Sequence, residues 1–256
     1  MIELSHVTCG YGGRAVVSVD DLCFGDGELT CVVGTNGSGK STLLKAIAGA
    51  LPHEGSICVD GLDVRGLSHR ERAHHLGLLP QRLAVPAMSV RTLVGHGRFS
   101  RMGVSKVLGE GDRAVVREAL ELCELEGLEE RQLESLSGGE LQRAYLAMAI
   151  AQEPGALLLD EPCASMDVRH RRWATDMLSR LAHERGMAVV ECTHDLVECF
   201  STADDVVLID GGWVRAAGTP AELARMPRPL YESFGVSVRK TTDNDAVFPY
   251  VLVDES

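Results

Sequence analysis

Residues 34–41 have the composition and spacing of a phosphate-binding loop. They read Gly-Thr-Asn-Gly-Ser-Gly-Lys-Ser and fit the pattern G-x-x-x-x-G-K-[ST] without a mismatch. Glycines let backbone N–H groups in such a loop turn toward phosphate oxygens, and the helix that follows points its positive end at the same place. Lys40 would reach the β- and γ-phosphates, and the hydroxyl of Ser41 would bind magnesium. The loop therefore predicts a site for ATP with Mg²⁺, whose contacts are Gly34, Asn36, Gly37, Ser38, Gly39, Lys40, Ser41 and Thr42.

Two acidic residues follow an apolar run later in the chain. Leu157, Leu158 and Leu159 read as a buried strand, and Asp160 and Glu161 come directly after it. The tip of such a strand lies beside the phosphate loop in doubly wound sheets. Asp160 would then hold magnesium through water, and Glu161 would polarise the attacking water or act as its base. Taken alone, the pair could equally be ordinary surface acids.

A pentapeptide between these two motifs narrows the interpretation. It reads Leu-Ser-Gly-Gly-Glu over residues 136–140. Together with the phosphate loop, it resembles the ATP-binding subunits of ABC transporters, in which this pentapeptide is the family signature. Two glycines at a helix start expose backbone donors, to which Ser137 adds a hydroxyl. The resemblance implies that Ser137, Gly138 and Gly139 of one copy bind the ATP of a second copy in a head-to-tail homodimer.

Four further residues match family elements and take their roles from the resemblance alone. Gln81 matches the glutamine that contacts magnesium and water, and His194 matches the histidine that contacts the γ-phosphate. Tyr11 matches the aromatic that stacks on adenine, and Asp167 matches a loop that crosses the dimer interface. Each could be an ordinary structural residue if seen alone. The expected catalytic set is Glu161, His194, Gln81 and Lys40, and the expected magnesium set is Ser41, Gln81 and Asp160.

The chain departs from the family pattern at two positions. Cys163 stands where threonine or a similar residue is usual, and Leu141 follows the signature where arginine or glutamine is common. Neither departure removes a catalytic group.

The elements that must position these residues can be read from apolar spacing. Residues 29–33 form a short apolar strand before the glycine loop, and residues 42–49 have helical spacing after it. Residues 88–152 are helical in pattern, with amphipathic helices over 113–126 and 139–151. The predicted fold class is α/β, a P-loop NTPase whose RecA-like core carries an antiparallel β subdomain and an inserted helical lobe. The expected ATPase domain is 1–230, with its core over 1–87 and 153–230, its lobe over 88–152 and a C-terminal appendage over 231–256.

Composition restricts the partners and the compartment. A formal net charge of -12 disfavours nucleic acid, which binds basic surfaces. Eight cysteines without a Cys-x-x-Cys pair suit a reducing compartment. No run approaches the roughly 18 apolar residues of a membrane helix, and the first residues contain no signal pattern. We expect a cytoplasmic protein that is peripheral on the inner face of the cell membrane through a permease.

Two segments are similar to ATPases that drive uptake of iron-siderophores, haem and cobalamin. One is residues 78–101, which follow the glutamine loop, and the other is the tail over 234–238 and 248–251. This resemblance implies an importer subunit that works with integral-membrane permease subunits and, indirectly, with an extracytoplasmic substrate-binding protein. Two alternatives stay open. One is an importer ATPase for zinc, manganese or an amino acid, and the other is an ABC-type regulatory ATPase without a permease.

Overall fold

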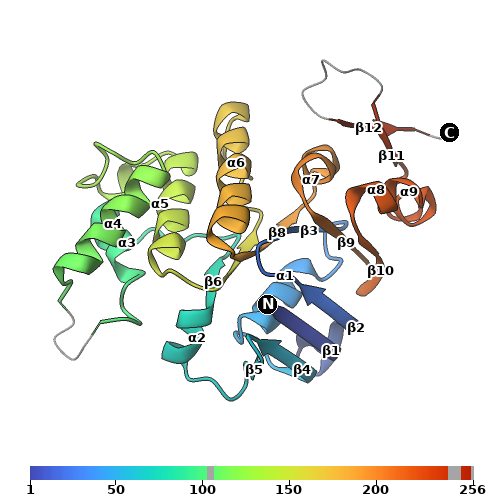
Figure 1. The fold of residues 1–256 in the computed structure, drawn as a ribbon, viewed down its shortest axis with the longest axis horizontal. Coiled ribbons are helices and arrows are strands. Elements are labelled where there is room, and N and C mark those ends of the chain that lie inside the picture. The colour runs from blue at the N-terminus through green and yellow to red at the C-terminus, as the bar shows by residue number, and fades with distance from the viewer. Residues whose placement is uncertain (103–106, 242–248, 255–256) are drawn as a thin grey trace.

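The computed structural model of the chain describes residues 1–102, 107–241 and 249–254. Its main sheet has ten strands in the order β5-β4-β1-β2-β10-β9-β3-β8-β7-β6. Helices cover both faces of this sheet, and the molecule is elongated (Figure 1). The predicted α/β class is therefore confirmed.

One end of the sheet is antiparallel. Its strands are β1 (Ile2–Tyr11), β2 (Arg14–Phe24), β4 (His53–Val59) and β5 (Leu62–Asp63). Strand β1 pairs with both β2 and β4, and the turn between β1 and β2 contains Gly12 and Gly13 at positive φ. This part corresponds to the predicted antiparallel β subdomain.

The other end of the sheet is parallel and leads to the glycine loop. It consists of β3 (Leu29–Val33), β6 (Leu76–Leu79), β7 (Ala156–Asp160), β8 (Ala188–Thr193) and β9 (Asp205–Asp210). Strand β10 (Trp213–Gly218) runs antiparallel to β9 and joins the two ends of the sheet by pairing Trp213 with Ser18. Because the carboxyl ends of β3, β7 and β8 share one edge, the segments that follow them meet there.

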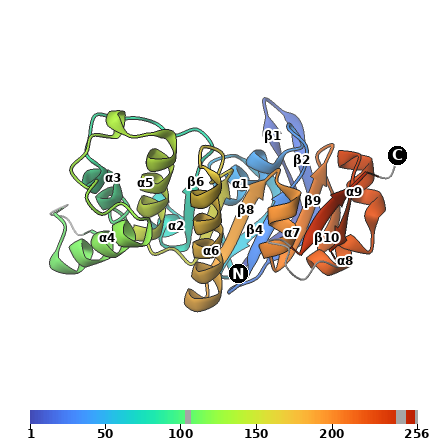
Figure 2. The same cartoon turned by 90° about the horizontal axis from the view of Figure 1, so that it is seen from above.

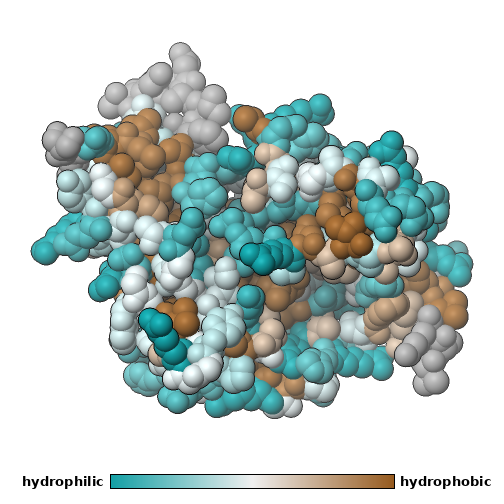
Figure 3. Space-filling model, turned by 180° about the vertical axis from the view of Figure 1, so that it is seen from behind, coloured by the Kyte–Doolittle hydropathy of each residue, from teal (hydrophilic) through white to brown (hydrophobic). Residues whose placement is uncertain are grey.

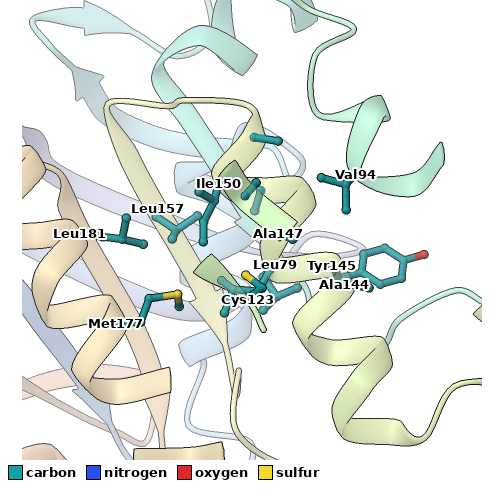
Figure 4. Packing of buried hydrophobic residues seen from close by; sticks show 14 of the residues in the cluster. Leu79, Val94, Cys123, Ala144, Tyr145, Ala147, Ile150, Leu157, Met177 and Leu181 are labelled. Atoms are coloured by element: carbon teal, nitrogen blue, oxygen red, sulfur yellow. The ribbon is translucent and has the colours of Figure 1, made fainter. Parts of the chain in front are cut away.

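Alternating side chains of the parallel strands face two helical layers. Leu158 packs in the core that contains α1 (Lys40–Ile47), whereas Leu157 and Leu159 pack in the core beneath α5 and α6. These last two helices span Gly138–Ala151 and Val168–Arg185. Figure 4 shows Ala147 and Ile150 of α5 and Met177 and Leu181 of α6 directed toward Leu157 and Leu79. Both faces of β7 are thus buried, which fixes the position of the two acids at its end.

Helices gather at one end of the molecule (Figure 2). They are α2 (His69–His75), α3 (Val90–His96), α4 (Glu110–Leu122), the 3-10 turn η1 (Leu133–Ser135) and α5. Buried Arg98 ties this group together, since its guanidinium bonds Asp112 at 3.0 Å and Glu153 at 2.6 Å. The helix predicted over 113–126 is wrong at its end, because it stops at Leu122 and Glu124 has a φ of 49°.

The C-terminal segment forms elements of its own. They are α8 (Pro220–Ala224), α9 (Pro227–Phe234), β11 (Ser237–Lys240) and β12 (Tyr250–Val253), and they follow α7 (Leu196–Thr202) and β9–β10 along the chain. Leu230, Val238 and Tyr250 share a buried cluster with Phe200 of α7. Apolar surface lies beside these strands (Figure 3), where Val251 and Leu252 are exposed. Of the tail residues used for the resemblance, Phe248 lies outside the described residues.

The strand, glycine loop and helix predicted around residue 34 are confirmed, since β3 ends at Val33 and α1 begins at Lys40. The predicted domain boundaries at 87/88, 152/153 and 230/231 stay a prediction. Within the described part of the chain, no helix has both the length and the apolar character needed to cross a membrane.

Candidate active site

One cavity of about 680 Å³ lies where the parallel strands end. Its walls come from six separate segments of the chain. The lining residues are Val16, the nine residues 34–42, Gln81, Glu161, His194 and Phe234. Gln81 follows β6, Glu161 follows β7 and His194 follows β8, so the topology of the sheet brings three predicted catalytic residues to the glycine loop.

The lysine of the glycine loop forms hydrogen bonds with the backbone at the start of the same loop. The Nζ of Lys40 donates to the carbonyl oxygens of Gly34 at 2.7 Å and Thr35 at 3.2 Å. Burial lowers the pKa of Lys40, whose residue is only 7% exposed. Gly39 has a φ of 109°, and a Cβ there would lie 2.9 Å from the Cβ of Val17, so glycine is required at this position. Helix α1 starts at Lys40 without a side-chain cap, which leaves its first N–H groups available to an anion.

Ser41 and Asp160 form the pair predicted to hold magnesium. The Oγ of Ser41 donates to Oδ1 of Asp160 at 2.9 Å. Asp160 is 5% exposed, and its burial raises its pKa, while the bond from Ser41 acts in the opposite direction. A hydroxyl and a carboxylate are the oxygen ligands that Mg²⁺ prefers, with substrate phosphates and waters completing its shell. These residues fit the ion: Ser41 lines the cavity, and Asp160 lies behind it.

The carboxylate of Glu161 lies beside two of the predicted site residues, Gln81 and His194. Its Oε2 accepts a hydrogen bond from Nε2 of Gln81 at 2.9 Å, and its Oε1 lies 3.7 Å from Nδ1 of His194. The carboxylate side chain is 16% exposed, against 66% for His194. A carboxylate held at the cavity wall can accept a proton from a water that approaches a bound phosphate.

The remaining predicted site residues do not line this cavity. Ser137 caps α5, with its Oγ and N–H both donating to Glu140. Asp167 caps α6 and accepts hydrogen bonds from the backbone N–H and the ring of His170. Gly138 and Gly139 lie against Ser165. Tyr11 is 50% exposed at the end of β1. The roles predicted for these residues toward ATP stay predictions.

Several residues at or near the site were not singled out as site residues in the sequence. Phe234 lines the cavity from α9, and Val16 lines it from β2. Gln142 is 4% exposed and bonds the backbone of Glu161. Only one of the missed residues carried a local signal: Glu191 is an acid within the apolar run Ala188–Thr193. Burial and the nearby carboxylates of Glu198 and Asp195 raise the pKa of Glu191 to about 8.

Comparison with known proteins agrees with this geometry. A family profile described as "ABC transporter" matches residues 18–164. The iron(3+)-hydroxamate import ATP-binding protein FhuC of Bacillus subtilis (strain 168) is 33% identical over 244 residues, which cover 94% of this chain and 90% of the relative. The Fe(3+) ions import ATP-binding protein FbpC of Streptomyces avermitilis is 39% identical over 228 residues, which cover 89% of this chain but only 65% of the relative.

A solved structure gives the same result for the fold. The structure described as the dimeric structure of MJ0796, a bacterial ABC transporter cassette, superposes with a TM-score of 0.77 at 27% identity and covers 86% of this chain and 99% of that chain. The predicted P-loop NTPase architecture of ABC ATPases is thereby confirmed. With a profile match over more than half its length, the chain belongs to the ABC transporter family.

Proposed function

We propose that this chain is the ATP-hydrolysing subunit of an ABC importer that drives uptake of an iron chelate such as a siderophore, or of haem or cobalamin, through a separate membrane permease. The observation that carries this proposal is the convergence of the glycine loop, Gln81, Glu161 and His194 on one cavity. The cavity offers a phosphate cradle and a carboxylate on the same wall. Such a site supports phosphoryl transfer to water, which depends mostly on positioning and on charge stabilisation.

The residues of the site have separate roles in phosphate binding, metal binding and proton transfer. The glycine loop and the start of α1 bind the phosphates through backbone N–H groups, and Lys40 adds a positive charge. Ser41, Asp160 and Gln81 would hold Mg²⁺, which neutralises charge on the phosphate oxygens. Glu161 takes the proton of the attacking water, and Gln81 orients the Glu161 carboxylate through its bond at 2.9 Å. His194, whose side chain is 66% exposed, would contact the γ-phosphate from the exposed side of the cavity.

The working unit in this proposal is a head-to-tail homodimer. Ser137, Gly138 and Gly139 lie at the start of α5 and outside the cavity of their own chain. They would complete the site of a second copy instead. The dimeric cassette with a TM-score of 0.77 supports this arrangement, because its chain is covered almost completely by the same fold.

The choice of cargo rests on the segment after Gln81 and on two relatives. Val85 and Phe99 lie in residues 78–101 and are 47% and 55% exposed. Exposed apolar side chains of this kind suit a permease contact. The relative matched along 90% of its length is named for iron(3+)-hydroxamate import, and the relative at 39% identity is named for Fe(3+) ions. Free ferric ion is therefore the second candidate cargo.

A reconstitution experiment tests the proposal. The chain is captured with its permease from detergent-solubilised membranes and reconstituted in proteoliposomes with candidate binding proteins. Each binding protein carries a ferric siderophore, haem, cobalamin, free Fe³⁺, zinc, manganese or an amino acid. We expect that one binding protein loaded with an iron chelate, haem or cobalamin stimulates ATP hydrolysis. Stimulation only by binding proteins loaded with zinc, manganese or an amino acid would reject the proposed cargo. Capture of no integral-membrane protein would reject the importer itself and favour a regulatory ATPase.

A further inference from the structure

Gln142 joins two parts of the site through one buried side chain. It lies on α5, the helix that begins at the signature, and only 4% of the residue is exposed. Its Nε2 donates to the carbonyl oxygen of Glu161 at 2.8 Å. Its Oε1 accepts from the backbone N–H of Ser165 at 3.2 Å. Both ends of the amide are therefore used, and both partners are backbone groups of the segment that follows β7.

The backbone of Glu161 needs such support. Its φ is 54°, in the left-handed region that is unfavourable for a residue with a side chain. The N–H of Glu161 donates to the carbonyl of Cys192 on β8 at 3.0 Å. The carbonyl of Glu161 accepts from Gln142 on the opposite helix. Glu161 is thus held on one side by the sheet and on the other by α5.

Resting on the ATPase activity proposed above, we propose that Gln142 is a positioning residue that fixes Glu161 for attack and links its position to helix α5. Gln142 reaches neither the cavity nor its phosphate loop, so it acts through the backbone of Glu161. The same amide holds Ser165, which itself lies against Gly138 and Gly139. A movement of the start of α5 is therefore transmitted to the backbone that carries the catalytic carboxylate.

The substitution Gln142→Met tests this link, because methionine keeps the length and burial of the side chain and removes both hydrogen bonds. We expect kcat for ATP hydrolysis to fall about tenfold or more, since small misplacements of a catalytic group are costly. The KM for ATP should stay within about twofold, because the phosphate loop is untouched. Thermal unfolding is recorded alongside, so that lost turnover is not confused with lost protein.

Gln152 provides a matched control at the other end of the same helix. Its Nε2 also donates to backbone carbonyls, those of Ala73 and Leu76, at 2.6 and 2.5 Å. Gln152→Met should lower the unfolding temperature without a comparable loss of kcat. If Gln142→Met keeps the wild-type kcat, or if both variants lose kcat in proportion to their loss of stability, the positioning role of Gln142 is overturned. A wild-type chain with no ATP hydrolysis would reject the proposed function instead.

A second variant gives a readout that a purely structural role would not move. In Gln142→Glu the acid form can donate to Glu161 and accept from Ser165, whereas the carboxylate can only accept. Burial should raise the pKa of the introduced acid into the range where ATPase assays are run. We expect the ratio of its kcat to the wild-type kcat to rise as the pH falls from about 8 to 6. The other ionisable groups near this segment, among them Glu161, His194 and Glu191, are the same in both proteins, so their contribution cancels in this ratio. A ratio independent of pH would contradict the link.

Discussion

The geometry of Glu161 suits a general base, because its side chain has limited exposure, a hydrogen bond orients its carboxylate and its backbone, with a φ of 54°, is held on both sides. Glu161→Gln keeps the shape and removes the base. We expect hydrolysis to slow by about a hundredfold or more, while ATP still binds and the dimer persists. Phosphate release and equilibrium nucleotide binding measure the two effects separately. Glu126→Gln, an exposed change of the same type, is the control. Normal turnover in Glu161→Gln would remove Glu161 from the mechanism.

Glu191 should make stability depend on pH. Burial and the neighbouring Glu198 and Asp195 raise its pKa from 4.5 to about 8, so the folded chain holds a proton here that the unfolded chain releases. The free energy of unfolding therefore falls as the pH rises from about 4.5 to 8, and little is lost below 4.5. Glu191 lines a second, smaller cavity whose other side chains include Cys163, Arg171 and His194, and these residues are the same in the wild type and in a Glu191 variant.

Glu191→Gln removes this proton linkage while keeping the size of the side chain. We expect the variant and the wild type to have similar unfolding temperatures near pH 5, and the variant to be more stable at pH 8 by roughly 1 to 3 kcal/mol. Chemical denaturation at both pH values measures the difference. Glu121→Gln on the exposed face of α4 should show no such trend. A constant difference between Glu191→Gln and wild type across the pH range would contradict the assignment.

At the residue scale, local motifs predicted the groups that now share the cavity, but not the groups that hold them. Lys40 and Ser41 could be found because their spacing within one loop is itself the signal. Gln142 could not, because its two partners lie in a segment that reaches it only through the packing of α5 against β7. A glutamine within a helix carries no sign of a buried backbone partner.

At the scale of elements, helix α9 contributes to the cavity a wall that no local pattern in the chain indicates. Phe234 is the last residue of α9 and lines the same cavity as the glycine loop. An aromatic side chain there can cover the apolar part of a bound nucleotide. Phe234→Ala should raise the KM for ATP several-fold with a smaller change in kcat. Binding of tripolyphosphate, which has no base or ribose, should be unaffected.

Tyr231→Ala is the control for α9, because Tyr231 lies on the same helix and is 43% exposed. It should leave the KM for ATP unchanged. Equal losses of ATP and tripolyphosphate binding in Phe234→Ala would show that the residue shapes the phosphate loop and does not contact the nucleoside. Unaltered ATP binding would show that α9 only borders the cavity.

Elements with strong periodicity were predictable, and their ends were less so. Strand β7 could be recognised because both its faces are buried, which demands a continuous apolar run. The end of α4 could not, because Leu125 is fully buried and continues the apolar pattern after the helix has stopped. Strands β11 and β12 were not recognised because their pairing joins two short segments across residues 242–248.

At the scale of the whole molecule, the separation of the signature from the cavity has a direct consequence. If each site is made of one copy's phosphate loop and the other copy's signature, two inactive variants should restore one another when mixed. Lys40→Ala disables the loop. Gly139→Asp places a carboxylate where a partner's γ-phosphate would bind, and a Cβ at this position meets only an ordinary contact with Ser165 at 3.4 Å. Each variant alone should be nearly inactive.

In the mixture, a mixed dimer pairs the intact loop of the Gly139→Asp chain with the intact signature of the Lys40→Ala chain. Its other site combines both defects. Random exchange makes half of the dimers mixed, and each has one working site of two, so hydrolysis should recover to about a quarter of the wild-type rate. Mixing Lys40→Ala with a chain that carries both substitutions should restore nothing. A site built within one chain cannot be repaired by a partner. A mixture no more active than its separate components would therefore contradict the head-to-tail dimer, without contradicting the cavity as the nucleotide site.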